Sequence, residues 1–279
     1  MNSEQVLDFQ HIRQKLADVC SSAIAKEYAL NLQPMHNCQK IEDALDETVE
    51  AMRSLEQEVE QPISGTKDIR TTCTKSRKEI ILTREELWDL HTTILAYNRM
   101  HRFFKEKYLL YPLLSLWVQD LPSHDKLTKR FERTFDAYGV LLDSATPKLQ
   151  QLRMTMSRTK NAIKNDLQRI LQDKDNQKYF QEAIVTMRNN RYVIPVKQEY
   201  RRAFPGLIHD RSATGATLYI EPMRLVDLNN ELQEATLAEE QEVLRIYKEL
   251  TELVRGHADT LLDACKRVTH VEFVYGKAE

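Results

Sequence analysis

The chain is poor in the two residues that most often interrupt helices. It has only six glycines and eight prolines among 279 residues, which leaves few places for tight turns or flexible linkers. Long helices are therefore the first expectation. Hydrophobic residues make up 42% of the chain and charged residues 29%, a balance that suits helices with one buried and one exposed face. The composition predicts a mainly α protein.

Residues 1–145 have the spacing of several short helices packed into one body. Apolar residues recur every three or four positions, which is the period of a helix with one face in a core. Thr83 followed by Glu86 predicts a capping box, which starts a helix by satisfying its first backbone N–H groups. The two apolar faces expected to face the core are Val6, Phe9, Ile12 and Leu16, and Ile41, Leu45, Val49 and Met52.

Two longer helical segments follow, separated by a stretch whose residue pattern is not helical. Thr146 is a good N-cap with Pro147 at the first helical position, so we expect an ascending helix over 146–182. A descending helix is expected over 223–255, and residues 256–279 return to the body. Residues 148–178 include eight basic and three acidic residues, whereas residues 225–254 include two basic and eight acidic residues. These net charges of +5 and −6 favour an antiparallel, coiled-coil-like pair, a two-helix lever.

Residues 183–222, between the two long helices, contain runs of β-branched and aromatic residues, which are typical of β-strands. The candidate strands are Ile184–Arg188, Arg191–Lys197, Leu207–Arg211 and Ala216–Glu221. Asn189 and Asn190 join the first two, and asparagine tolerates the positive φ of a tight hairpin turn. Pro195 has no N–H for a ladder, so an edge or a bulge is expected there. We predict a small four-stranded antiparallel sheet, a β clamp, at the tip of the lever, about 40 Å from the body by the helix rise.

Basic residues gather in this β segment. Between Arg188 and Arg211 there are six basic and two acidic residues, a net charge of +4. Such a tip suits contacts with nucleic-acid phosphates, with aromatic rings to stack on bases. The candidate nucleic-acid-binding residues are Arg188, Arg191, Lys197, Arg201, Arg202, His209 and Arg211, and the candidate stacking residues are Tyr192, Tyr200 and Phe204. The alternative is that some arginines only solvate the outer face of a sheet whose inner face is Val193, Ile194, Leu218 and Ile220.

The same segment resembles the clamp of a known protein family. The motifs that carry the resemblance are Arg191–Lys197, Glu199–Arg201, Pro205–Gly206, His209–Asp210, Ser212, Gly215–Pro222 and Leu228–Leu232. They are similar to the clamp signature of the second MutS family, MutS-two. Asp68–Arg70 and Leu142–Pro147 are similar to that family too, so the resemblance extends over nearly the whole chain. Asn190 departs from it, because the family is expected to have glycine there.

The resemblance implies a helical core with a lever and a clamp, without the mismatch-reading and connector domains of repair-type MutS proteins. In that family the lever leads into an ATPase, and a nuclease-like domain follows. This chain ends about where the ATPase is expected to begin, and its sequence contains no Gly-x-x-x-x-Gly-Lys-Ser/Thr phosphate loop. We therefore expect no catalysis and no cofactor within this chain, whereas full-length members of the family use ATP and magnesium.

The implied partners are branched or duplex DNA, or the ribosome and its rRNA. The family is associated with restraining homologous recombination and with splitting collided ribosomes. The resemblance also implies a dimer through the ATPase region of full-length members, and a monomer or weak dimer for this chain. The competing interpretation is a helical protein-interaction scaffold with an incidental basic tip. Salt separates the two, because binding to phosphates weakens steeply as salt rises.

Other classes of site have little support in the sequence. His209, Asp210 and Ser212 lie too close along one strand and turn to form a catalytic triad. No His-Glu-x-x-His or Cys-x-x-Cys pattern suggests a metal site. The four cysteines are expected to be buried free thiols: Cys20, Cys38, Cys73 and Cys265. The longest apolar stretch is too short to cross a membrane, and the N-terminal residues lack a secretory signal pattern, so a cytoplasmic location is expected.

Overall fold

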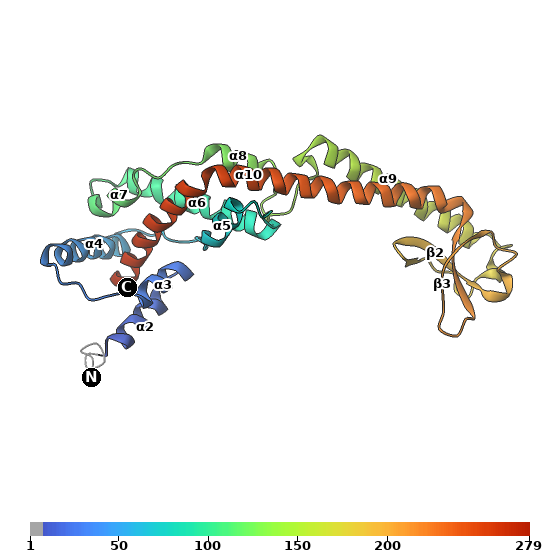
Figure 1. Cartoon of the computed structure of the whole chain (residues 1–279), viewed down its shortest axis with the longest axis horizontal. Coiled ribbons are helices and arrows are strands. Elements are labelled where there is room, and N and C mark those ends of the chain that lie inside the picture. The colour runs from blue at the N-terminus through green and yellow to red at the C-terminus, as the bar shows by residue number, and fades with distance from the viewer. Residues whose placement is uncertain (1–7) are drawn as a thin grey trace. The chain divides into compact units, whose positions relative to one another are not determined.

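The computed structural model describes residues 8–279 and divides into two compact units (Figure 1). Of the described residues, the body unit comprises 8–141 and Ile246–Glu279, and the sheet unit comprises Leu142–Arg245. The predicted class, mainly α with a small four-stranded antiparallel sheet, is confirmed. Val6, expected on an apolar face, lies outside the described residues. Along the described chain, no helix is both long and apolar enough to cross a bilayer.

The body unit is built from short helices and the second part of a long one. Its helices are α2 (Phe9–Val19), α3 (Ala23–Leu30), α4 (Cys38–Gln57), α5 (Arg70–Arg77), α6 (Arg84–Glu106), α7 (Pro112–Val118) and α8 (Asp125–Glu132), and α10 (Val226–Ala278) runs through both units. The capping box is confirmed, because the Thr83 hydroxyl accepts from the Glu86 N–H and the Glu86 carboxylate accepts from the Thr83 N–H. Helix α6 then buries Leu87, Leu90 and Ile94 completely.

Helix α4 contradicts the expectation for its apolar face. Its buried residues are Glu50, Ala51 and Ser54, and its exposed apolar residues are Leu45, Val49 and Met52. The Glu50 carboxylate accepts hydrogen bonds from the backbone N–H groups of Leu113 and Leu114, each at 3.0 Å. The first N–H groups of a helix need acceptors, so this contact caps α7 and turns a polar side of α4 inward. Ile12 of α2, also expected to face the core, is exposed as well.

The sheet unit carries four antiparallel strands in the spatial order β1-β2-β4-β3. They are β1 (Thr186–Arg188), β2 (Arg191–Lys197), β3 (Gly206–Arg211) and β4 (Thr217–Pro222). Asn189 and Asn190 have φ angles of 51° and 60°, so the hairpin predicted at this pair is confirmed. Strand β3 contains a bulge, where the register with β4 shifts between Ile208 and Asp210.

Pro195 lies where β2 changes its partner. Strand β2 pairs with β1 up to Val193 and with β4 from Ile194 onward. The Pro195 carbonyl accepts from the Gln181 N–H rather than from β4. Because the N and O of one strand residue point to the same side, the absent N–H faces the side on which β1 has ended. On that side β2 is bridged by Phe180 and Gln181 and not by a strand of the sheet, and the bulge lies in β3.

Helix α9 (Pro147–Gln172) begins as predicted and ends earlier than predicted. The Thr146 hydroxyl accepts from the Leu149 N–H, which is the expected N-cap. The helix stops at Gln172, so the range 146–182 is not one continuous helix. Asp173 has an extended backbone, and its carboxylate accepts from the Asp175 N–H and from the Asn176 amide. Such local bonds compete with helix formation, and a 3₁₀ turn, η2 (Gln177–Tyr179), leads on toward the sheet.

Within the sheet unit, α9 runs antiparallel to the first part of α10 (Figure 1). The ion pairs between them are Lys148–Glu242 at 3.6 Å and Arg153–Glu239 at 2.9 Å, and Asp166 lies 3.3 Å from Arg224, just before α10. The partner numbers fall as α9 ascends, as an antiparallel pair requires. Glu242 is buried, and hydrogen bonds from Arg245 and Thr146 lower its pKa to about 2. Opposite charges therefore meet where the two helices touch.

Candidate nucleic-acid interface

One side of the sheet packs on the two helices and forms the core of the sheet unit. The buried residues of this cluster are Ile163, Leu167, Phe180, Ile194, Val196, Phe204, Leu218, Ile220, Leu225 and Leu232. Three of the four residues expected on the inner face of the sheet belong to it, and the fourth, Val193, is also buried. Apolar burial therefore holds the sheet against α9 and α10, and this leaves the charged residues to be placed on the remaining surface.

A buried carboxylate holds two of the candidate binding residues. Glu221 of β4 is fully buried and accepts from Arg191 Nη1 at 2.9 Å, and His209 Nε2 lies 2.5 Å from its other oxygen. The Arg191 guanidinium also donates to Asn230 and Gln233 of α10, at 2.5 and 3.2 Å. Arg191 and His209 are thus engaged within the protein, because a buried carboxylate needs such partners. The structure gives both residues a partner in Glu221, and their contact with phosphate stays a prediction.

Asn229 extends this network from the sheet to α10. Its amide nitrogen donates to Glu221 at 2.7 Å and to the Tyr192 carbonyl at 3.3 Å, and its oxygen accepts from the Tyr192 N–H at 3.2 Å. One buried side chain therefore bonds two strands and the helix that carries it. We define the Glu221 network as Arg191, His209, Glu221, Asn229 and Asn230. It fixes the orientation of the sheet on α10 by directional bonds, which apolar packing alone does not supply.

Arg188 is also paired inside the sheet. Its Nε lies 3.2 Å from Asp210, and its guanidinium carbon lies 4.1 Å from the centre of the Tyr219 ring. Ser212, meanwhile, accepts from the Thr217 N–H. Since His209 contacts Glu221, the residues His209, Asp210 and Ser212 turn to three different partners.

Four candidate residues remain available on the surface: Lys197, Arg201, Arg202 and Arg211. Arg201, Arg202 and Arg211 are exposed, and Lys197 is half-buried with its Nζ 3.4 Å from the Lys178 carbonyl. Within residues 8–279, none of the four lies in an ion pair with a carboxylate. We call these four residues the basic tip. Cations that have no carboxylate partner can approach phosphate oxygens without first breaking an ion pair.

The three candidate stacking residues are less available than expected. Phe204 belongs to the buried cluster and meets Phe180 edge to face at 5.7 Å between ring centres. Phe204 therefore packs in the core of the sheet unit and presents little ring surface to a base. Tyr192 and Tyr200 are half-buried and pack against the same cluster, and Tyr200 lies 5.2 Å from the Tyr179 ring. The basic tip therefore offers charge more than aromatic surface.

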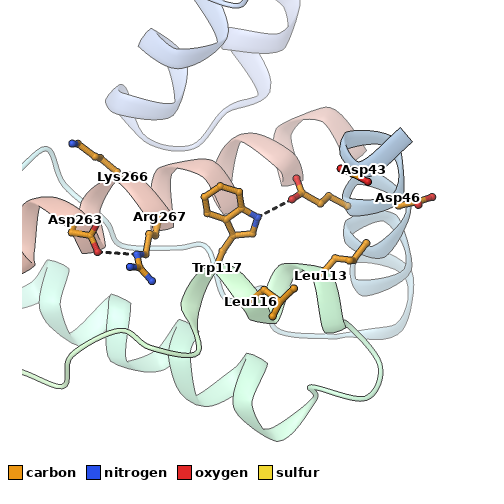
Figure 2. A pocket seen from close by; sticks show the side chains of 9 residues that line it. Asp43, Asp46, Leu113, Leu116, Trp117, Asp263, Lys266 and Arg267 are labelled. Atoms are coloured by element: carbon orange, nitrogen blue, oxygen red, sulfur yellow. Dashed lines mark hydrogen bonds and ion pairs between the residues drawn. The ribbon is translucent and has the colours of Figure 1, made fainter. Parts of the chain in front are cut away.

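The body unit contains a separate open cleft of about 740 Å³ (Figure 2). Trp117 lies at its centre, stacked on His270 at 3.8 Å, and its indole N–H donates to Glu47 at 2.8 Å. Burial raises the pKa of Glu47, but the hydrogen bonds from His270 and Trp117 outweigh it and lower the pKa below its usual range. Arg267 pairs with Asp263 at 2.8 Å. The polar groups of the cleft thus mostly satisfy one another, which makes it a weaker candidate than the basic tip.

Comparison with known proteins identifies the family. No family model matches the chain. The chain is 35% identical to endonuclease MutS2 from Geobacillus sp. (strain WCH70) and 34% identical to that of Bacillus cereus (strain Q1), each over 98% of this chain and 35% of the relative. It is 36% identical to endonuclease MutS2 from Alkaliphilus metalliredigens (strain QYMF), over 99% of this chain and 35% of the relative. The chain belongs to the MutS2 family. It spans about a third of the length of these curated relatives.

Membership of the MutS2 family confirms the resemblance seen in the clamp motifs, and the structure gives several motif residues a physical role. Glu221 and Asn229 were quoted for the resemblance without being assigned to the site. The burial of Glu221 had no sequence signal, because strand alternation places it on the face opposite to the apolar Ile220. Asn229 bonds both the Glu221 carboxylate and the backbone of Tyr192.

Proposed function

We propose that the sheet unit is the nucleic-acid-binding part of a MutS-type ATPase, and that this chain itself carries no catalysis. The observation that supports the proposal is the basic tip, whose four cations have no carboxylate partner among the described residues. Lys197 and Arg211 end strands β2 and β3, and Arg201 and Arg202 lie in the turn between these strands, so all four are attached to the sheet that the Glu221 network and the buried cluster hold on α10. The ligand we propose is a phosphodiester backbone, in branched or duplex DNA or in rRNA.

The chemistry of the tip favours recognition of shape and charge over base sequence. Lysine and arginine side chains bind phosphate oxygens, and such contacts position a protein without reading bases. The aromatic rings are mostly packed into the protein, so extensive base stacking is not offered. A module of this kind suits branched DNA, where several backbones converge, and equally suits the folded rRNA surface of a collided ribosome. Suppression of recombination and ribosome rescue are both compatible with this contact.

The experiment is a fluorescence-anisotropy titration of the 279-residue chain with a labelled four-way DNA junction and with a labelled rRNA stem, at 50 to 200 mM salt. The test variant is Arg201→Gln/Arg202→Gln. Each phosphate contact contributes about 0.9 to the slope of log affinity against log salt for duplex DNA. Losing two contacts lowers the slope by about 1.8. Raising the salt from 50 to 200 mM should therefore weaken binding by the variant about 12-fold less than binding by the wild type.

The matched control replaces two exposed lysines of the body unit, Lys126→Gln/Lys129→Gln, which removes the same charge. It should leave affinity and slope unchanged. Arg191 is kept intact in both variants, because removing it would strip Glu221 of a partner and disturb the sheet itself. Equal binding by wild type and the Arg201/Arg202 variant would show that the tip is not the contact.

The choice between DNA and ribosome is tested with the ATPase region attached. The same two-site variant is introduced into a full-length relative and assayed on junction DNA and on stalled ribosomes. Loss of binding on one ligand only assigns that ligand to the tip. Purified 279-residue chain should show no nucleotide turnover and no nuclease activity, and measurable turnover would overturn the non-catalytic assignment.

A protein-interaction scaffold remains the second candidate, and the exposed apolar face of α4 favours it. Leu45, Val49 and Met52 are exposed on one side of this helix, which is the arrangement found where a helix packs on a partner. Association through this face would tolerate salt and would be weakened by Val49→Glu. Binding through the basic tip would instead weaken as salt rises and would be unaffected by Val49→Glu.

A further inference from the structure

A tryptophan ring lines the open cleft of the body unit with one of its faces uncovered. Trp117 of α7 is half-buried, and one face of its indole stacks on His270 at 3.8 Å between ring centres. Figure 2 shows the ring lying broadside in the cleft, with Leu113 and Leu116 beside it. His270 thus covers one face of Trp117, and the other face is turned toward the cleft. We call this space of about 740 Å³ the Trp117 cleft.

The orientation of the ring is fixed by Glu47 of α4. The indole N–H donates to one oxygen of Glu47 at 2.8 Å, and the other oxygen lies 2.8 Å from His270 Nε2. Burial alone would raise the pKa of Glu47, but the hydrogen bonds from His270 and Trp117 lower it, so the carboxylate stays ionised. An anionic acceptor at the N–H makes the face of the indole more electron-rich, and that face is where an aromatic ring binds a cation. The ring is therefore ordered and polarised for a cation before any ligand binds.

Other aromatic rings of the chain already hold a cation over one face, whereas Trp117 does not. Trp117 has no lysine or arginine over its ring among residues 8–279, although tryptophan is the ring type that binds cations best. Arg267 lines the same cleft but pairs with Asp263 at 2.8 Å. The open face of Trp117 is thus available to a cation from another molecule. The rings that hold a cation of their own chain, at 4.1 to 5.4 Å from the ring centre, are Phe9, Phe103, Tyr179, Tyr219 and Phe273.

The walls of the Trp117 cleft have an excess of negative charge. Asp43 and Asp46 lie within about one turn of α4 from Glu47, and both are exposed. Asp43 accepts from the Gln39 amide at 2.9 Å, and neither aspartate forms an ion pair with another described residue. The charge of the lining attracts a cation and disfavours an anion such as a nucleotide. The lining carboxylates are Asp43, Asp46, Glu47 and Asp263, and the lining cations are Lys266 and Arg267, which gives a net charge of −2.

The apolar part of the cleft suits the stem of a long basic side chain. Leu113 and Leu116 line the cleft, and Leu116 is 52% exposed. Lysine and arginine lay their methylene groups on such apolar surface while the charged head group stays in a polar environment. Arginine fits better, because its planar guanidinium stacks on an aromatic face and binds carboxylates through two parallel hydrogen bonds. A cleft of about 740 Å³ has room for a drug-sized ligand, which corresponds to an arginine together with its neighbours in a peptide.

We propose that the Trp117 cleft binds an arginine of a partner polypeptide, with the guanidinium on the open face of Trp117 and with Asp43 and Asp46 attracting the basic segment around it. The stem of the arginine lies on Leu113 and Leu116. The partner is therefore a protein segment that presents an exposed arginine in a basic context. This inference concerns the body unit and does not depend on the nucleic-acid contact proposed for the basic tip.

The test is an anisotropy titration of the 279-residue chain with the labelled peptide Gly-Ser-Arg-Gly-Arg-Ser-Gly. The reference peptide has citrulline in place of both arginines, which keeps the shape and removes the charge. The arginine peptide should bind about tenfold more tightly, which corresponds to about 1.4 kcal/mol. Unlabelled arginine peptide should also change the tryptophan fluorescence of the chain. Trp117→Phe should abolish that change, because the remaining Trp88 packs on His91 and Phe135 outside the cleft.

A second variant tests the charge without touching the packed ring. Asp43→Asn/Asp46→Asn should weaken binding of the arginine peptide about fivefold and leave binding of the citrulline peptide unchanged, as expected for two solvent-exposed ion pairs. Both positions are exposed, so the variant should keep the wild-type circular dichroism. The matched control is Glu42→Gln/Glu56→Gln, which removes two exposed acids of the same helix that do not line the cleft. The control should bind the arginine peptide as the wild type does.

Equal affinity for the arginine and citrulline peptides would overturn the inference. Wild-type affinity in both Trp117→Phe and Asp43→Asn/Asp46→Asn would also overturn it, because the peptide would then bind elsewhere. Spermidine that binds as tightly as the peptide would show a general polyamine site, and AMP that changes the Trp117 fluorescence more strongly would show an anionic stacking ligand. Either result would contradict the assignment to a peptide arginine. The titrations with junction DNA and rRNA test the proposed function separately, so each proposal can fail without the other.

Discussion

Replacing Glu221 by glutamine should loosen the sheet from α10 while leaving the body unit unchanged. Glu221 is fully buried and is held by Arg191, His209 and Asn229 at 2.9, 2.5 and 2.7 Å. Glutamine has nearly the same volume, so Glu221→Gln tests the charge and not the packing. The amide oxygen can still accept from Arg191 and Asn229, and the amide nitrogen then faces His209 Nε2, which accepts only in its other tautomer, so the main loss is the buried negative charge beside the Arg191 guanidinium.

The magnitude follows from the loss of one partner of a buried ion pair, which costs about 3 to 5 kcal/mol. The side chain of Arg191 keeps 19% exposure and its bonds to Asn230 and Gln233, so water and amides compensate part of the loss. We therefore expect a value near the lower limit, about 3 kcal/mol. That corresponds to roughly 150-fold more frequent opening of the sheet, at about 1.4 kcal/mol for each factor of ten.

The assay is native-state hydrogen exchange of the backbone amides of β2 and β4, which reports local opening of the sheet. Trp88 and Trp117 both lie in the body unit, so their fluorescence during urea unfolding is an internal control that should not shift. A double-mutant cycle with Arg191→Met should give a coupling of at least about 1 kcal/mol, because the two side chains are in direct contact. Additive effects, or a change below that value for Glu221→Gln alone, would refute the idea that this carboxylate holds the sheet.

Two further predictions concern the body unit. Burial lowers the pKa of His124 to about 4, so its neutral form is kept in the native state while the unfolded chain binds a proton below about pH 6.5. Its contribution is therefore complete above about pH 6.5 and is lost as the pH falls. Urea unfolding followed by tryptophan fluorescence should show a loss of about 2 kcal/mol between pH 7 and pH 5, and His124→Asn, which tolerates the positive φ here, should flatten this part of the profile. Cys38 is exposed, unlike the buried thiol expected, whereas burial raises the pKa of Cys20 to about 11 and of Cys73 to about 12. A thiol reagent at pH 8 should thus modify one thiol per native chain quickly and four after unfolding, and two or more fast equivalents would contradict this burial pattern.

The elements that the sequence predicted well are those determined by near neighbours. The capping box at Thr83 and Glu86, the N-cap at Thr146 and the hairpin turn at Asn189-Asn190 each depend on bonds within a few residues. Such signals hold in almost any tertiary context, because the backbone groups they satisfy belong to the same short segment. The end of α9 was misjudged, although its cause, the Asp173 side chain, is equally local.

The side of a helix that faces the core was decided only by the tertiary structure. Periodicity located the apolar face of α4, but the helix buries Glu50 because α7 presents two N–H groups that need an acceptor. Nothing near Glu50 in the sequence reveals that contact, since its partners are more than sixty residues away. Residue spacing shows which side chains share a face, and only the packed neighbours determine where that face points.

The same division applies to the candidate site. The sequence determined that positive charge gathers between Arg188 and Arg211, and that two helices of opposite charge flank it. Which cations remain available was decided by acids brought close in the fold, because Glu221 takes Arg191 and Asp210 takes Arg188. Charge is a property of composition, whereas its neutralisation depends on distances of a few ångströms between residues that lie far apart in the chain.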